Sequence, residues 1–145
     1  MRSKLKDIIN RDKVIHEISP DAMLLEAAKK MANNRVGSLL VKDGDKICSI
    51  ITERDMLFKV LAKNLDIEKT KVSAVMSESL LVVSTETTAA EALMIMTEKR
   101  IRHLPVYDGE IFIGLLSIGD MAKWASTRYQ EKQHEVESLV HYISQ

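Results

Sequence analysis

The chain has 145 residues, a length that suffices for one compact domain or two small ones sharing a core, and this excludes a large multidomain enzyme. Its 21 basic and 21 acidic side chains give a formal charge of zero, so the positive charge expected of a nucleic-acid-binding protein is missing overall. Because no apolar run reaches the roughly 18 residues of a membrane span and the amino terminus has no signal-peptide core, we expect a cytoplasmic protein that does not contact membranes.

The first predicted elements are a short strand and a helix. The segment 14–19 is expected to form the strand. Ser19 and Asp21, which flank a proline, predict the start of the helix, and apolar residues keep helical spacing as far as Asn34, where the helix should end.

Two aliphatic strands are predicted next, at 36–41 and 46–51. Between them lie Asp43 and Gly44, a pair that tolerates positive φ and closes hairpins. A second helix is expected from about 53 to 63. The first half of the chain therefore predicts the order β-α-β-β-α.

The second half predicts the same order. The expected elements are strands at 80–84, 101–106 and 111–116, a helix from about 88 to 99, and a helix that begins at Ser117.

The two halves are a tandem duplication, because residues 14–56 align with 79–121 without a gap, at an offset of 65 positions. The identical pairs include Glu26 with Glu91, Met31 with Met96, Arg35 with Arg100, Gly44 with Gly109 and Asp55 with Asp120. The segments 4–10 and 71–77, which precede the repeats, also resemble each other after a two-residue shift. Since so small a unit buries little apolar surface alone, we expect the two copies to pack against each other.

Both repeats carry a hydroxyl residue three positions before an aspartate, Thr52 with Asp55 and Ser117 with Asp120, where the third strand meets the following helix. One interpretation is a capping box, in which the hydroxyl accepts from a helix amide and the carboxylate reaches back. The other is a binding site, in which the turn presents amides and a hydroxyl to a phosphate while the aspartate chelates ribose hydroxyls. The local pattern by itself favours the cap.

The whole chain resembles the tandem cystathionine-β-synthase (CBS) domain pair. The resemblance is carried by the duplicated units and by the stretches MANNRVGSLLVKDG, MTEKRIRHLPVYDG, SIITERDM and GLLSIGDM. It implies an α/β fold in which pseudo-symmetric repeats at 5–65 and 70–126 pack through their sheets, followed by a helical extension at 127–145. It also implies a regulatory or sensor module without chemistry of its own.

The resemblance implies two clefts that bind adenosine-containing ligands. AMP is the first expectation, with ADP, ATP, NAD or S-adenosylmethionine as alternatives, and no metal is expected. Asp55 and Asp120 match the family's ribose-binding aspartates, and Thr52 and Ser117 match the hydroxyls that contact phosphate or ribose. The adenine is expected beside Ile18, Ser19, Val36, Gly37 and Ser38 in the first copy and beside Val83, Ser84, Ile101, Arg102, His103 and Pro105 in the second.

The two sites are expected to differ in charge. The second copy has Arg102 and His103 where the first has Gly37 and Ser38. A guanidinium fork and a protonatable imidazole suit phosphate oxygens, so we expect the second site to bind phosphorylated ligands more tightly. The alternative interpretation of these side chains is a solvated rim.

Other positions in the motif region add to this asymmetry. Arg54, next to Asp55, is a further candidate for phosphate contact and is equally typical of a surface residue. The second copy has Gly114, which is common in the family, where the first has Ser49, whose side chain would narrow the first cleft.

Disulfide and metal chemistry find little support. Cys48 is the only cysteine and lies in a strand-like run, which is typical of a buried structural thiol. His134 and His141 are seven positions apart on the terminal helix, but two histidines without further ligands make a poor metal site.

The carboxyl-terminal residues 119–143 predict a long helix with an interrupted apolar stripe. We expect this helix to pack on a partner subunit and the chain to be a homodimer. We find no nucleophile with its base and no phosphate loop, so we do not expect an enzyme. The alternative to a nucleotide sensor is a ligand-free scaffold for protein association, and the regulated partner is unidentified in either case.

Overall fold

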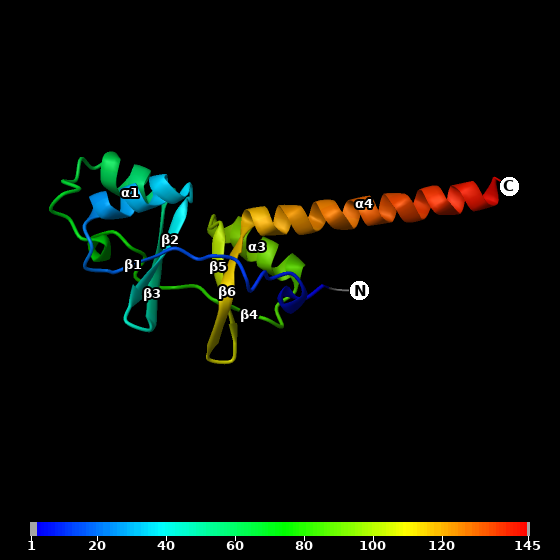
Figure 1. Ribbon diagram of the computed structural model, residues 1–145, viewed down its shortest axis with the longest axis horizontal. Helices are drawn as coiled ribbons and strands as arrows, with labels where there is room; N and C mark the ends of the chain where they lie inside the picture. Colours follow the sequence, from blue (N-terminus) through cyan, green and yellow to red (C-terminus); the bar gives the residue numbers. More distant parts are fainter. Residues whose placement is uncertain (1–2, 145) are drawn as a thin grey trace. The chain divides into compact units, whose positions relative to one another are not determined.

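The computed structural model describes residues 3–144, which form two compact units (Figure 1). The first, here named the repeat-1 unit, is Val14–Leu80. The second, the repeat-2 unit, consists of the rest of the chain, both before and after the first. Each contains a three-stranded sheet and helices, which confirms the α/β class and the duplicated order of elements.

The repeat-1 unit has its strands in the order β1-β2-β3, with β1 parallel and β3 antiparallel to β2. Its elements are β1 (Glu17–Ile18), α1 (Leu24–Asn34), β2 (Ser38–Asp43), β3 (Lys46–Thr52), α2 (Glu53–Asp55), the π-helix η2 (Met56–Leu61) and the 3₁₀ helix η3 (Val72–Ala74).

The repeat-2 unit has the same sheet topology, in the order β4-β5-β6. Its elements are the 3₁₀ helix η1 (Leu5–Asp7), β4 (Val83–Ser84), α3 (Ala89–Lys99), β5 (His103–Asp108), β6 (Ile111–Ser117) and α4 (Ile118–Ile143).

The hairpins are closed as the sequence predicts. Asp43 pairs with Lys46, and Gly44 in the two-residue loop between them has a φ of 60°. Gly109 has the same φ in the second hairpin. Glycine adopts this left-handed conformation without steric cost, which explains its presence at the same point of both repeats.

The first predicted helix begins later than expected, at Leu24 instead of near Ser19. The Ser19 hydroxyl accepts a hydrogen bond from the Asp21 amide, at 3.2 Å, and so forms a local turn and not the helix cap. Backbone groups at the helix entry bond instead to a distant segment: Leu24 N–H donates to the Thr70 carbonyl at 2.9 Å. The equivalent helix α3 begins at the corresponding position, Ala89, whose amide likewise donates to a distant carbonyl, that of Ser3.

The second predicted helix, 53–63, is α-helical only over Glu53–Asp55 and continues as a π-helix to Leu61. The predicted strands at 14–19 and 80–84 are also shorter in the structure, because only Glu17–Ile18 and Val83–Ser84 pair with their neighbours.

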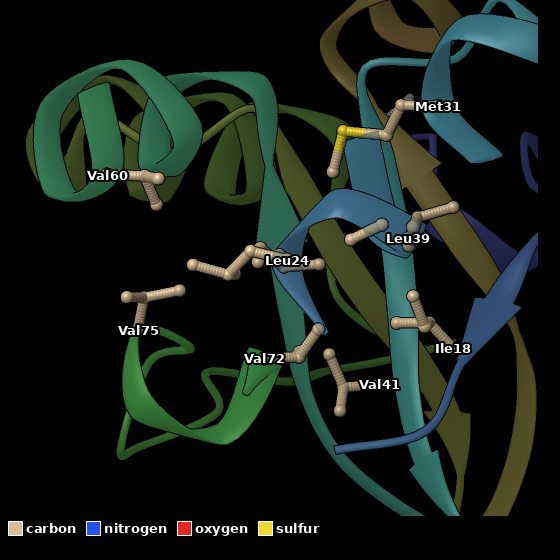
Figure 2. Packing of buried hydrophobic residues seen from close by; sticks show 10 residues of the cluster. Ile18, Leu24, Met31, Leu39, Val41, Val60, Val72 and Val75 are labelled. Atoms are coloured by element: carbon tan, nitrogen blue, oxygen red, sulfur yellow. The ribbon is translucent and has the colours of Figure 1, made fainter. Parts of the chain in front are cut away.

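The apolar core of the repeat-1 unit lies between its sheet and its helices (Figure 2), and the repeat-2 core is built from the corresponding strands and helices. Seven core residues of the repeat-1 unit recur in the repeat-2 unit at the 65-residue offset. The pairs are Ile18 with Val83, Leu24 with Ala89, Ala27 with Ala92, Met31 with Met96, Leu39 with Leu104, Val41 with Val106 and Ile51 with Leu116. The duplication therefore preserves the positions that supply most of the hydrophobic stabilisation.

The segment that precedes each repeat packs into the core of the other repeat's unit. Val72, which follows the first repeat, is fully buried in the repeat-1 core, and Leu5, which precedes the first repeat, is fully buried in the repeat-2 core. Isolated bridges fix both segments, Met23 with Lys71 and Lys4 with Thr88. The segment before β1 thus completes the core of the repeat-2 unit, and the segment before β4 completes the core of the repeat-1 unit.

The long helix α4 is buried only near its start, at Met121. From residue 125 to residue 144 every side chain is exposed. No helix in the described residues combines the length and the apolar character needed to cross a membrane.

Candidate functional site

The hydroxyl and aspartate of the repeat-1 motif form a complete capping box at the start of α2. The Thr52 hydroxyl accepts from the Asp55 amide at 3.2 Å, and Asp55 Oδ2 accepts from the Thr52 amide at 2.9 Å. This reciprocal pattern satisfies two backbone donors that the helix leaves without internal partners. The capping interpretation of the motif is therefore confirmed.

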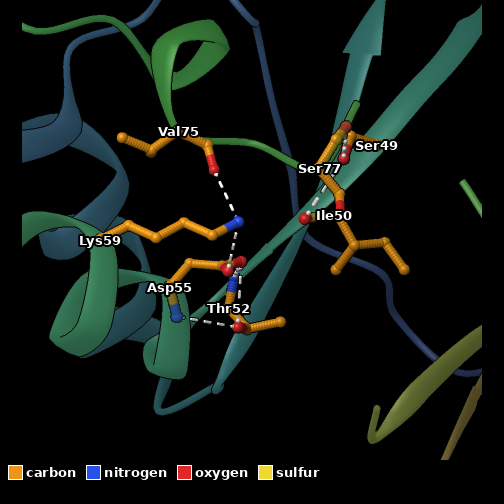
Figure 3. Close-up of polar contacts among 7 residues, drawn as sticks. All are labelled: Ser49, Ile50, Thr52, Asp55, Lys59, Val75 and Ser77. Atoms are coloured by element: carbon orange, nitrogen blue, oxygen red, sulfur yellow. Dashed lines mark hydrogen bonds and ion pairs between the residues drawn. The ribbon is translucent and has the colours of Figure 1, made fainter. Parts of the chain in front are cut away.

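A lysine holds the other oxygen of the same carboxylate (Figure 3). Lys59 Nζ lies 3.1 Å from Asp55 Oδ1 and also donates to the Val75 carbonyl at 3.2 Å. The Asp55 side chain is 19% exposed and that of Lys59 is 41% exposed. The turn therefore presents a carboxylate and an ammonium group side by side at the edge of solvent.

The repeat-2 motif repeats this arrangement with a different lysine. Ser117 and Asp120 form a capping box, with the Ser117 amide donating to Asp120 Oδ2 at 2.8 Å and the Asp120 amide donating to the Ser117 hydroxyl at 3.0 Å. Lys13 Nζ donates to the same Asp120 oxygen at 3.0 Å.

The electrostatics of this turn favour the ionised aspartate. Partial burial raises the pKa of the Asp120 carboxyl, but the hydrogen bonds from Ser117 and Lys13 and the positive charge of Lys13 outweigh burial. The pKa of Asp120 therefore lies below the ordinary value of 3.8. The carboxylate is ready to accept hydrogen bonds at neutral pH.

The two lysines are functional candidates that the sequence analysis missed. Lys59 lies four positions after Asp55, in the π-helix η2 that continues α2, whereas Lys13 precedes the first repeat and is 107 positions from Asp120. They are not equivalent under the duplication, since position 124, which corresponds to Lys59, is a tryptophan. The i,i+4 spacing of Asp55 and Lys59 was a usable signal, but no local pattern points to Lys13.

Strand register brings part of the predicted site together. Ser38 is directly opposite Thr52 in the β2–β3 pair, and His103 is directly opposite Ser117 in the β5–β6 pair. The preceding residues also contact the turns, because the Arg102 carbonyl accepts from the Ile118 amide at 2.9 Å. The Ser38 and His103 side chains are therefore cross-strand neighbours of the motif residues Thr52 and Ser117.

Gly37 and its equivalent in the second repeat, Arg102, have different charged surroundings. A Cβ placed on Gly37 would meet the Glu53 carboxylate at 3.0 Å, so an acidic group fills the space beside this glycine. The repeat-2 unit has the exposed Arg102 at the equivalent position and Ile118 in place of the acid. The predicted charge difference between the two turns is thus increased by Glu53.

Ser49 is fully buried and donates from its hydroxyl to the Ser77 carbonyl at 2.9 Å (Figure 3). This hydrogen bond joins β3 to the segment after η3. In the repeat-2 unit, a Cβ on Gly114 would meet Ile9 at 3.2 Å and the Asn10 carbonyl at 3.9 Å. The segment at Ser77 therefore passes β3 where the segment at Ile9 and Asn10 passes β6. Ser49 forms a hydrogen bond to the first segment, whereas Gly114 leaves space for the second.

The residues predicted from the first strands are divided between core and surface. Ile18 and Val83 are buried in the cores, where their side chains pack under the helices. The hydroxyls of Ser19 and Ser84 accept from amides two residues further on and close local turns. Of the other predicted residues, Val36 and Ile101 pack partly buried against the cores, and Pro105 is buried in β5 opposite Leu115.

Exposed aliphatic side chains precede the first strand in both units and were not predicted. Val14 is 75% exposed, and Leu81 and Val82 are 42% and 43% exposed. Because Leu40 N–H donates to the His16 carbonyl, the segment that begins at Val14 runs beside the start of β2.

A groove of about 680 Å³ also lies within the repeat-1 unit. It is lined by Ala28, Met31, Ala32, Arg35, Val36, Gly37, Glu53, Met56, Val60, Leu61 and Ile67. It includes the predicted Val36 and Gly37 but neither Thr52 nor Asp55, so these predicted residues do not all face one hollow. Arg54 lies over the Phe58 ring, with its guanidinium carbon 5.4 Å from the ring centroid, which is a surface cation–π contact.

The remaining candidates for chemistry are unremarkable in structure. Cys48 is half-buried against the repeat-1 core, and its thiol lies 3.7 Å from the Lys46 carbonyl. His134 and His141 are on the exposed part of α4. Within residues 3–144 no three or more histidine, cysteine or acidic side chains are grouped so that they could hold a metal ion.

Comparison with known families gives two matches to the CBS domain, at residues 5–62 and 72–127. The mitochondrial CBS domain-containing protein CBSX3 of Arabidopsis thaliana is 37% identical over 128 residues, which cover 85% of this chain and 61% of that protein. Two other curated relatives from the same plant are 44% identical over 101 residues, and the chain spans only 18% of their length.

Solved structures give the same result. A candidate signal-transduction protein with CBS domains from Burkholderia ambifaria MC40-6 is 36% identical, with a TM-score of 0.79 over 85% of this chain and 93% of that one. A hexameric CBS-CP12 protein from bloom-forming cyanobacteria is 26% identical, with a TM-score of 0.72 over 84% of this chain and 67% of that one.

Proposed function

The chain belongs to the CBS domain family, with a tandem pair of CBS domains, and from this we propose that it is a regulatory module that binds an adenosine nucleotide, AMP first, at its strand-to-helix turns. Proteins of this kind are typically non-catalytic regulatory modules. The observation that carries the proposal is that both turns place a lysine ammonium within 3.1 Å of the motif carboxylate, although the lysines are not equivalent under the duplication.

The chemistry of each turn suits the sugar and phosphate of a nucleotide. An ionised carboxylate accepts hydrogen bonds from two vicinal ribose hydroxyls, and in the repeat-2 unit the Ser117 amide and Lys13 both bond to Asp120 Oδ2. The lysine and the motif hydroxyl beside it donate to phosphate oxygens. The exposed Val14, and Leu81 with Val82, supply aliphatic surface for the adenine ring.

The proposed sites are unequal, and the repeat-2 turn binds phosphorylated ligands more tightly. It combines Lys13 with the exposed Arg102 and with His103, which lies opposite Ser117. The repeat-1 turn has Lys59 but also the Glu53 carboxylate beside Gly37, which repels phosphate. This difference corresponds to about one or two decades in affinity, because each charge-assisted hydrogen bond contributes roughly 1.5–3 kcal/mol.

Calorimetric titration with AMP and with 2′,3′-dideoxy-AMP tests the ribose contact. We expect Asp120→Ala to weaken AMP binding about tenfold or more and to change dideoxy-AMP binding little, because only AMP has the hydroxyls that the carboxylate binds. The matched control is Glu91→Ala, since Thr88 and Glu91 form a capping box of the same type at the start of α3. Equal losses for both ligands in Asp120→Ala would show that Asp120 acts only as a helix cap.

A specific observation favours a second function, a ligand-free scaffold. The motif carboxylates already have intrachain partners in both turns, so the structure accounts for the two aspartates without a ligand. A thermal-shift screen with AMP, ADP, ATP, NAD and S-adenosylmethionine separates the two functions, because a ligand that binds only the native state raises the melting temperature. If none of them raises it, the scaffold is the function.

CBS proteins form oligomers, as the hexameric CBS-CP12 structure shows for its own chain. For this chain we propose a homodimer, because the exposed part of α4 carries apolar side chains that a partner subunit would cover.

A further inference from the structure

The exposed part of α4 carries a coiled-coil seam. Residues 125, 129, 132, 136, 139 and 143 alternate in spacing between four and three, which is the heptad pattern of helices that pack side by side. Five of the six are Ala, Tyr, Val, Leu and Ile, and the sixth is Lys132. The large apolar members are Tyr129, Val136, Leu139 and Ile143, which are between 58% and 80% exposed.

This helix lacks the support that helices of its length need. Most helical stability in proteins comes from packing of an apolar face and not from the helix propensity of the residues. From residue 125 onward α4 has no buried side chain. The seam is therefore an apolar face that nothing in residues 3–144 covers.

Two charges determine which helix fits. Lys132 lies in the seam and Glu135 lies beside it on the neighbouring turn, and neither forms an ion pair within the described residues. In a parallel pair of α4 helices the same positions face each other, so Lys132 would meet the partner's Lys132 in the interface. Like charges held together in an interface are strongly unfavourable.

In an antiparallel pair the seam lysine meets a carboxylate and not a second lysine. When two copies of α4 are paired in opposite directions along this seam, Tyr129 lies opposite the partner's Leu139 and Lys132 lies opposite the partner's Val136. The register also places Ala125 opposite the partner's Ile143, so the whole exposed seam is covered over about 27 Å of helix. Lys132 then lies next to the partner's Glu135, and the twofold axis creates this ion pair twice.

We propose that α4 pairs antiparallel with α4 of a second copy of this chain, in the register that brings Lys132 next to the partner's Glu135. This inference rests on the proposed homodimer and adds its interface and orientation. It does not depend on nucleotide binding, because it uses no residue of the turns.

Sedimentation equilibrium of the full chain tests the register through charge reversal. Lys132→Glu and Glu135→Lys should each weaken association roughly tenfold or more, because each places like charges together twice in the dimer. The double variant should associate nearly as the unaltered chain does, and a mixture of the two single variants should form heterodimers. Glu137→Lys is the matched control, since Glu137 lies outside the seam and pairs with His134 in its own helix.

Disulfide trapping tests the orientation directly. In a Cys48→Ala background, a mixture of Ala125→Cys and Ile143→Cys chains should form the mixed disulfide on oxidation, while Ala125→Cys alone should not cross-link. Homodisulfides of Ala125→Cys would overturn the antiparallel pairing. A dimer insensitive to both charge reversals would overturn the register and leave the homodimer standing, whereas a monomer at micromolar concentration would overturn both.

Discussion

The replacement Asp120→Asn isolates the ionic role of the repeat-2 motif. Asparagine keeps an oxygen that can accept from the Ser117 amide, but it removes the negative charge from the start of α4 and from Lys13. A negative charge at a helix amino terminus contributes about 0.3–1 kcal/mol. A partly exposed ion pair contributes about 0.2–1 kcal/mol, and the Lys13 and Asp120 side chains are 36% and 30% exposed. We therefore expect a loss of roughly 0.5–2 kcal/mol at neutral pH.

Urea denaturation followed by tryptophan fluorescence measures this loss. Trp124, the only tryptophan, lies one turn after Asp120 in α4 and packs against the repeat-2 core, so it reports on the unit that contains the change. With typical urea slopes of about 1–3 kcal/mol per molar, the midpoint should fall by a few tenths of a molar or more. Glu110→Gln is the matched control, because it removes one charge from an exposed hairpin residue of the same unit.

The pH dependence of the difference follows from the lowered pKa of Asp120. A carboxyl whose pKa is lower in the folded state stabilises the protein above the unfolded-state value and loses this contribution as the pH falls through the folded-state value. The free-energy difference between the unaltered chain and Asp120→Asn should therefore be complete at pH 7 and shrink below about pH 4. A difference that stays the same at pH 7 and pH 3 would refute the ionic explanation.

Three further changes test the fold. Leu104→Ala should cost about 2–5 kcal/mol in the free energy of unfolding, measured by Trp124 fluorescence in urea, because the side chain is fully buried; a cost below 1 kcal/mol would contradict that packing. Ser49→Ala should cost about 1 kcal/mol by circular dichroism in urea, since it removes the hydrogen bond to the Ser77 carbonyl, and no loss would mean that the bond is absent. Gly109→Ala should cost about 1 kcal/mol from backbone strain alone, because an added Cβ meets no atom within 4 Å; an unchanged melting temperature would contradict the positive φ.

Local features of the fold could be predicted from the sequence because they depend on neighbouring residues. The hairpin glycines, the strand pairs around them and the capping boxes are determined within a few positions of the chain, and they appear where they were expected. The constant offset of 65 positions identifies the duplicated core, since apolar residues recur at the same places. The motif carboxylates were likewise placed at the starts of helices.

Features that depend on distant contacts could not be predicted in this way. The entry of α1 is bonded to the segment around Thr70, and a local helix signal does not contain that segment. Whether Ser49 projects into a cleft or bonds another segment also depends on where residue 77 passes β3.

The amino-acid sequence by itself determined the two α/β repeats and the chemistry of their turns, because hydrophobic spacing and capping residues act over one or two turns of chain. Only the tertiary structure decided which partners the turns acquire. Leu5 completes the core of the repeat-2 unit, and Lys13 pairs with Asp120 across 107 positions of sequence. Contacts of this kind are determined by which surfaces of the folded chain lie within a few ångströms of each other, and sequence spacing carries no information about that distance.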